Sequence, residues 1–191
     1  MSVDHLADRT VVVLIDLQKG ITALPTVHPA ADVVGRAADL ARAARTRGLP
    51  VVRVRVAFSA DRGDVVQGRV DAPPPAVAMA ADFAAYDERV PLHDGDIRIT
   101  KRGWDAFHGT ELDLQLRRRR ITGIVLAGIS TSIGVESTAR TGRELGYEIA
   151  VAGDAVTDLV AAAHDTSLQI ILPRLARIDT TAAIVDALAR Q

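Results

Sequence analysis

Cysteine is absent from this sequence of 191 residues. Without cysteine the chain can form no disulfide, carries no thiolate nucleophile and offers no sulfur ligand for a metal. The histidines also lack metal-ligand spacing, because none is followed by a second histidine four positions later. We therefore expect no metal and no cofactor. The histidines are His5, His28, His93, His108 and His164.

A charge excess and a long apolar run are missing as well. The formal net charge of -1 gives no general attraction to nucleic acid or to an anionic membrane. No stretch approaches the roughly 18 uncharged apolar residues of a membrane span. The opening "MSVDHLADRT" lacks the basic start and apolar segment of a signal peptide. We therefore expect a cytoplasmic protein that acts on a small-molecule substrate.

Aromatic residues make up only 3% of the chain, although hydrophobic residues overall make up 48%. Such a composition favours one compact domain over residues 1–191, packed from small aliphatic side chains. Short apolar runs alternate with segments of helical spacing, which predicts a three-layer α/β/α sandwich with a doubly wound, mainly parallel sheet. The predicted strands are 10–16, 50–58, 96–101, 121–128, 147–155 and 175–179. The predicted helices are 31–48, 110–120, 159–172 and 181–190, with one more running from a turn at 128–134 to Gly146.

Three chemically useful features follow the carboxyl ends of predicted strands, where ligands bind in such folds. Asp16 ends the first strand and Lys101 ends the third, and a partly dehydrated pair of this kind can share and relay a proton. The stretch "GISTSIGVESTAR" (128–140) turns from a strand into a helix, whose first N–H groups can stabilise developing negative charge. These features predict one active site, to which the turn contributes Ile129, Ser130, Ser132, Ile133 and Gly134.

Four segments carry a resemblance to a known family: "LIDLQKG", "KRGWDAFHGTELDLQLRRR", "IVLAGISTSIGVESTAR" and "GYEIAVAGDAVTD". With them the chain, from about Thr10 to its last helix, resembles the isochorismatase-like hydrolase superfamily of nicotinamidases, carbamoylsarcosine amidases and isochorismatases. In the amidase branch an Asp, a Lys and a Cys form the catalytic triad. Asp16 and Lys101 match the first two, and Gly134 stands at the Cys position.

The glycine at the Cys position decides which chemistry the resemblance implies. A glycine cannot attack a carbonyl, so a Cys-dependent amidase is excluded. Isochorismatases also have "IG" here, matching Ile133 and Gly134, and cleave a vinyl (enol) ether. Their Asp protonates the enol carbon, an oxocarbenium-like species forms, and water adds. Asp16 would be this acid and base, with Lys101 as its electrostatic partner, and Gly134 would leave room for substrate or water.

The resemblance implies further features. A non-proline cis peptide at Ile129–Ser130 would help shape the oxyanion hole, and the chain would form a homo-oligomer, a dimer or higher. Ser130 and Val56 replace a Tyr and a Gln that help isochorismatases bind isochorismate, which argues against that substrate. Nicotinamidases bind a metal through an Asp and histidines after the second strand, but "VAFSADRGD" has no histidine there.

Two further residues and one segment complete the predicted site. Gln18 accompanies Asp16 and is interpreted as an orienting residue, and Trp104 could form a wall of the pocket. The segment 59–80 is long and rich in turn residues, which predicts a loop over the site or an interface.

Two other functions stay open at this point. A silent family member would bind a small metabolite in the same place without converting it. A serine-dependent amidase would use Ser130 or Ser132, but the sequence shows no nearby histidine as base. Ser132 is better explained as the N-cap of the following helix.

Overall fold

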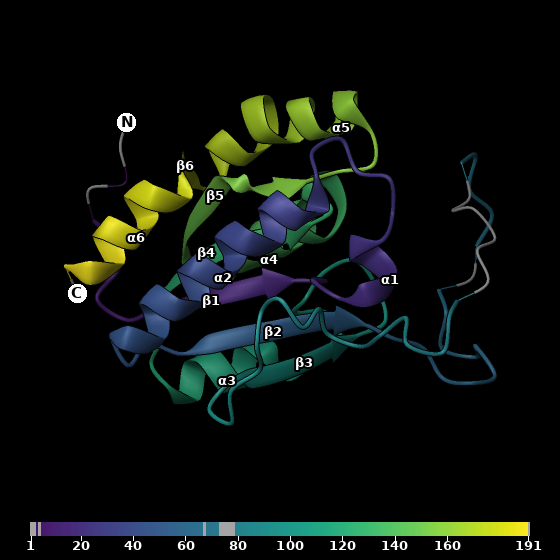
Figure 1. Cartoon of the computed structure of the whole chain (residues 1–191), viewed down its shortest axis with the longest axis horizontal. Helices are drawn as coiled ribbons and strands as arrows, with labels where there is room; N and C mark the ends of the chain where they lie inside the picture. Colours follow the sequence, from purple (N-terminus) through teal and green to yellow (C-terminus); the bar gives the residue numbers. More distant parts are fainter. Residues whose placement is uncertain (1–2, 4, 67, 73–78, 191) are drawn as a thin grey trace.

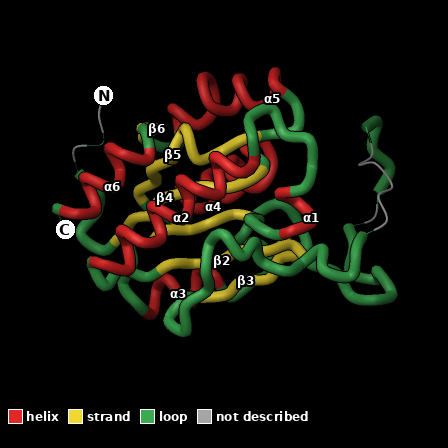
Figure 2. Tube along the Cα trace, in the orientation of Figure 1, coloured by secondary structure: helices red, strands yellow, loops and turns green. Residues whose placement is uncertain are grey.

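The computed structural model describes residue 3 and residues 5–66, 68–72 and 79–190, and its centre is a six-stranded sheet. The strand order is β3-β2-β1-β4-β5-β6, and every neighbouring pair is parallel. The predicted α/β class with a doubly wound sheet is confirmed (Figure 2). The strands are β1 (Thr10–Ile15), β2 (Val51–Val56), β3 (Ile97–Lys101), β4 (Gly123–Ile129), β5 (Glu148–Thr157) and β6 (Arg177–Asp179).

Helices cover both faces of the sheet (Figure 1). One layer contains α2 (Ala30–Thr46) and α6 (Thr181–Ala189), which pack side by side. The other contains α3 (Leu112–Arg118) and α4 (Glu136–Glu144), and α4 continues from a π-helical turn, η1 (Thr131–Val135). The remaining helical elements are α1 (Lys19–Thr22), α5 (Ala161–Thr166), η2 (Ser167–Ile171) and η3 (Leu172–Arg174).

Strand β1 shows why the central strands read as continuous apolar runs. Its side chains alternate between the two faces, as in any strand. Val12 and Leu14 join the core beneath α2 and α6, whereas Val13 and Ile15 join the core beneath α3 and α4. Both faces are covered, so no position of this strand meets water, and all six residues are buried.

Helix α2 lies close to the sheet because its inner face is made of small and aliphatic side chains at helical spacing. The helix ends at Thr46, and Gly48 then adopts a positive φ of 68°, which glycine accepts without steric cost. The predicted range of 31–48 therefore matches the helix to within two residues at its end. The buried residues are Val33, Val34, Ala37, Leu40, Ala41 and Ala44.

Beside α2, the irregular segment 79–96 covers β2, and the sequence did not predict this role. Arg53 of β2 is buried beneath it and donates from Nη1 to the carbonyl oxygen of Val90 at 2.7 Å. The guanidinium also lies 5.0 Å from the ring centre of Tyr86, whose hydroxyl donates back to the Arg53 carbonyl oxygen. These contacts explain a charged residue inside an otherwise apolar strand.

The segment 59–80 was predicted to lie over the site or in an interface. Figures 1 and 2 show its described parts, 59–66, 68–72 and 79–80, extending away from the sheet and helices. Asp64 nevertheless pairs with Arg102, the residue after Lys101, so the start of this loop is anchored beside the predicted site, while residues 67 and 73–78 lie outside the described residues. Within the described ranges, no helix combines the length and the apolar character that crossing a membrane requires.

Candidate active site

Asp16 follows β1 directly and is held in an unusual backbone conformation. Its φ is +50°, in the left-handed region that aspartate tolerates better than most residues, and its N–H donates to the Val54 carbonyl oxygen at 3.1 Å. The side chain is 8% exposed, and Oδ2 lies 2.8 Å from Lys101 Nζ. The strand end therefore presents a buried carboxylate to a buried amine.

Lys101 is the last residue of β3 and reaches Asp16 across β2, which lies between β1 and β3 in the sheet. Its side chain is 2% exposed, and Nζ also donates to the carbonyl oxygen of Trp104. Ile97 and Ile99 alternate with it on the face beneath α3 and α4, so Lys101 points to that face as well.

Burial and the lysine act in opposite directions on the Asp16 carboxyl. Burial raises the pKa of Asp16 from 3.8 to about 6, although the charge and hydrogen bond of Lys101 act in the opposite direction. Oδ2 is engaged by Lys101, whereas Oδ1 is buried and has no hydrogen-bond partner among the described residues. A proton on this carboxyl therefore sits on Oδ1, which is free to donate it.

The turn between β4 and η1 closes the site from the other side. The Ile129–Ser130 peptide bond is cis, as the resemblance implied. A Cβ built on Gly134 would lie 3.3 Å from Lys101 Nζ and 3.4 Å from Asp16 Oδ2. It would also come within 2.7 Å of Ile15 Cγ2. Position 134 thus faces the Asp16–Lys101 pair, and any side chain there would touch both members.

Two polar side chains that the sequence analysis missed hold this turn from outside. Asp158, just after β5, accepts from the Ser132 N–H at 2.7 Å and from Ser132 Oγ at 2.8 Å. His164 of α5 lies with Nδ1 2.8 Å from Thr131 Oγ1, and both side chains are buried. Asp158 had a local signal, as an acid at a strand end, whereas the contact with His164 depends on how α5 docks.

Ser132 is therefore not the helix N-cap, and that prediction is wrong. Ser130 occupies the cap position before η1, without a side-chain capping bond, because the π-helical turn begins two residues earlier than expected. The sequence indicated no histidine near the turn, but the structure brings one there. Among the described residues, the histidine that bonds to this turn is His164, and its partner is Thr131 rather than a serine.

The other predicted site residues have mainly backbone partners. Gln18 is fully buried: its Nε2 donates to the carbonyl oxygens of Val56 and Phe83, and its Oε1 accepts from the Val56 N–H. The Ile133 N–H donates to the Ser130 carbonyl oxygen at 3.3 Å. Ile129 is buried in the core beneath α2, and Trp104 is 66% exposed.

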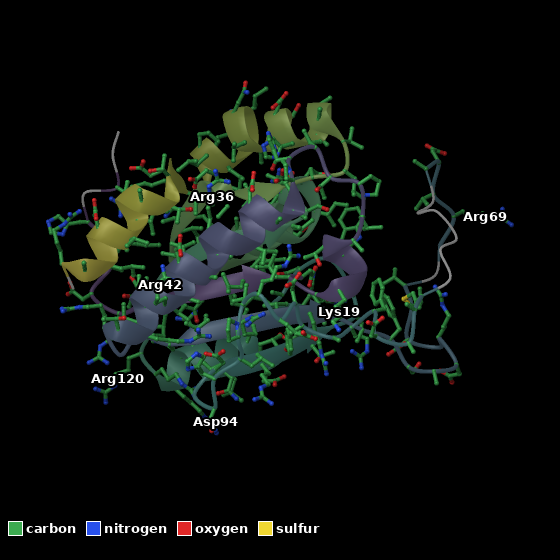
Figure 3. The ribbon with its side chains drawn as sticks, in the orientation of Figure 1. Lys19, Arg36, Arg42, Arg69, Asp94 and Arg120 are labelled. Carbon is green, nitrogen blue, oxygen red and sulfur yellow. The ribbon has the colours of Figure 1, made fainter. Side chains whose placement is uncertain are left out.

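The principal cavities lie away from the catalytic pair. Among the described residues, Asp16, Lys101 and Gly134 line none of the four. The largest, of about 950 Å³, lies at the amino ends of the strands and includes Arg45 and Asp96. In Figure 3, the labelled Lys19 lies beyond the carboxyl end of β1, and the labelled Arg120 lies at the amino ends of the strands. The side chains of the pair are themselves almost fully buried.

The described residues also offer no evident place for a metal ion. Within the described ranges, no group of three or more histidine, aspartate or glutamate side chains is arranged to hold one. Asp64 instead pairs with Arg102 and accepts from Ser59, and Asp61 also accepts from Ser59. These acids are engaged with protein donors.

Comparisons with known proteins agree on one family. The model of the isochorismatase domain matches residues 10–183. The isochorismatase family protein YecD of Escherichia coli O157:H7 is 46% identical over 185 residues, covering 95% of this chain and 97% of YecD. An isochorismatase family protein from Burkholderia thailandensis superposes with a TM-score of 0.92 at 40% identity, covering 96% and 97% of the two chains. N-carbamoylsarcosine amidase from Thermoplasma acidophilum gives a TM-score of 0.72 at 25% identity, covering 91% and 96%.

Proposed function

The chain belongs to the isochorismatase family and is a hydrolase, and from this membership and the Asp16–Lys101 pair we propose that it hydrolyses an enol (vinyl) ether in a small polar metabolite. One observation carries the proposal. The Asp16 carboxyl has one oxygen on Lys101 and the other without a partner, and its pKa is raised to about 6. A general acid works best when its pKa lies near the operating pH.

The proposed reaction needs no covalent intermediate on the protein. Asp16 donates its proton from Oδ1 to the terminal enol carbon, and the double-bond electrons form the new C–H bond. The ether oxygen stabilises the resulting oxocarbenium carbon. Water adds to that carbon and returns a proton to Asp16. The hemiketal then collapses to a carbonyl compound and an alcohol, so one water is consumed and the acid is regenerated.

Gly134 supports this chemistry over amide hydrolysis through an acyl-enzyme. Position 134 faces both members of the pair, and it supplies no nucleophilic atom. The whole chain contains no cysteine, so it is not a Cys-dependent amidase. The lack of a side chain at this position also lets the turn pack directly against Ile15 and the catalytic pair.

The test is a screen of small enol ethers and small amides, read by the gain of one water in mass. We expect turnover of an enol ether and a loss of about a hundredfold or more in Asp16→Asn, which removes the proton donor. Asp94→Asn, in an exposed loop labelled in Figure 3, is the matched control and should keep full activity. Full turnover in Asp16→Asn, together with its loss in Ser130→Ala, would instead identify a serine-dependent amidase.

A second candidate, a silent member that binds a metabolite, is favoured by the burial of the pair. Asp16 and Lys101 are 6% and 2% exposed and line none of the four principal cavities within the described residues. The same screen separates the two functions if binding is followed by NMR of the Asp16 carboxyl carbon. A compound that shifts this signal and is recovered unchanged would support the silent function.

A further inference from the structure

The outer side of the segment 130–135, here called the 130–135 turn, is fixed by a carboxylate from the neighbouring strand. Asp158 is 2% exposed, and its Oδ2 accepts both the N–H and the hydroxyl of Ser132, at 2.7 and 2.8 Å. Its Oδ1 accepts from the Leu159 N–H at 2.7 Å. A buried carboxylate with several donors is held in one orientation, because each charge-assisted bond restricts it further.

A second side-chain hydrogen bond holds the 130–135 turn next to the bond between Ser132 and Asp158. The hydroxyl of Thr131 pairs with His164 Nδ1 at 2.8 Å, and the imidazole packs against the ring of His28, with ring centres 4.9 Å apart. Thr131 and Ser132 are adjacent, so two consecutive residues of the turn are tied to the segment that follows β5. Gly134 comes two residues later and faces Asp16 and Lys101 on the inner side.

We propose that Asp158 is a positioning residue of the active site. By holding Ser132 it fixes the distance of Gly134 from the Asp16–Lys101 pair. The assignment of a role in turnover rests on the proposed function, but the positioning itself does not. The Ser132 N–H is committed to Asp158, so this amide does not contribute to stabilising charge on a substrate, in contrast to the sequence prediction for the turn.

The chain contains a matched control for this contact. Asp154, four residues earlier on β5, accepts from the N–H and hydroxyl of Thr181, both at 2.7 Å. This bond pattern repeats that of Asp158 with Ser132, but it anchors α6 rather than the turn. Asp154 is more exposed and also pairs with Arg36 at 3.3 Å, so its substitution reports the general effect of losing a carboxylate with its Ser/Thr-type bonds, and only substitution of Asp158 should affect the site.

The first readout uses a thiol placed at position 134. In Gly134→Cys, the helix N-terminus and the Lys101 amine should lower the pKa of the thiol below its usual value of about 8.5, outweighing the Asp16 carboxylate that also faces this position. The pH dependence of alkylation by iodoacetamide measures this pKa, and the native protein gives no background because it has no thiol. Gly35→Cys, at an exposed position with nothing within 4 Å, should titrate as an ordinary thiol.

Adding Asp158→Asn to Gly134→Cys should raise the pKa of the thiol and slow alkylation at pH 7 by about tenfold, because the turn moves away from Lys101. Loss of the Asp158 charge alone would lower this pKa, so a rise reports displacement. Asp154→Asn should leave the profile unchanged. An identical profile in both double variants, or a fall in the pKa with Asp158→Asn, would overturn the proposal.

The second readout needs no thiol and covers the case in which Gly134→Cys fails to fold. Asp158→Glu keeps the charge and moves it by one methylene, and Asp154→Glu does the same at the control site. Displacement of the turn admits water, so the pKa of Asp16 should fall from about 6 toward its ordinary value in Asp158→Glu only. Equal Asp16 titrations in the two variants would contradict positioning. Neither readout depends on turnover, so failure of the proposed reaction is distinguished from failure of this inference.

Discussion

At the scale of single residues, the ionised carboxylate of Asp16 is disfavoured by its surroundings. Burial raises the pKa to about 6, and Lys101 offsets only part of that effect. The left-handed backbone at this residue adds local strain, which proteins tend to retain where a side chain must be aimed. The cost in stability and the readiness to donate a proton therefore have the same physical cause.

This cause predicts how stability depends on pH. An acid whose pKa is raised on folding binds its proton more tightly in the native state, so native stability falls as pH rises from about 4 to about 6. The Asp16→Asn variant has no carboxyl at this position, so it lacks this pH-dependent contribution to stability. The free energy of unfolding of this variant, relative to that of the native chain, should therefore rise by roughly 2 kcal/mol between pH 4 and pH 7. Urea unfolding at both pH values measures the change, and a constant difference would contradict the raised pKa.

Site residues that stand at a recognisable place in a sequence pattern could be predicted. Site residues that are brought together only by the packing of one element on another could not. Asp16 and Lys101 stand at the ends of apolar runs, so their meeting follows once the strands are parallel. Gly134 was identified by resemblance to a motif. The contact between Thr131 and His164 joins segments 33 residues apart and depends on where α5 packs, which no spacing in the sequence indicates.

At the scale of elements, the close approach of β4 to β1 sets the geometry of the turn. Gly128 has a φ of +132°, and a Cβ there would lie 2.1 Å from the carbonyl oxygen of Ile15. The clashing atom is backbone, so no side-chain rotation relieves it. Because Ile15 precedes Asp16 and Gly128 precedes the cis peptide, this contact connects the two halves of the site.

Gly128→Ala should therefore destabilise the protein by roughly 3 kcal/mol or more, from strain and overpacking together. Gly146→Ala is the matched control, since Gly146 also has a positive φ, of +89°, but a Cβ there meets nothing within 4 Å. It should cost about 1–2 kcal/mol from strain alone. Urea unfolding compares the two, and equal losses would show that the approach of β4 to β1 is not constrained by this residue.

Most elements could be predicted because strand and helix patterns alternate clearly along the chain. The six strands lie where the apolar runs indicated, with ends that differ by a few residues. The features that escaped prediction include the four-residue helix α1, the π-helical geometry of η1 and η2, and the covering of β2 by 79–96. Each is short or irregular and is stabilised by distant partners, so local periodicity carries no sign of it.

At the scale of the whole molecule, apolar side chains are exposed next to the segment that holds the 130–135 turn. Val27, Leu159 and Val160 are 40%, 41% and 57% exposed, and the Val27 N–H donates to the Asp158 carbonyl oxygen at 2.8 Å. Apolar side chains gathered on a surface are typical of contacts between proteins. The family resemblance implies a homo-oligomer, and this surface is where we expect subunits to meet.

Val160→Lys should therefore weaken self-association by about tenfold or more, since burying an unpaired amine is costly. Leu92→Lys is the control, because Leu92 is similarly exposed, at 40%, but precedes β3 at the opposite end of the sheet. Sedimentation equilibrium measures both. A native chain that stays monomeric, or equal effects of the two variants, would contradict this location. If subunits do meet here, association buries residues next to Asp158, which holds the 130–135 turn against Asp16. The pKa of Asp16 should therefore depend on protein concentration in the native chain. In Val160→Lys that dependence should be lost.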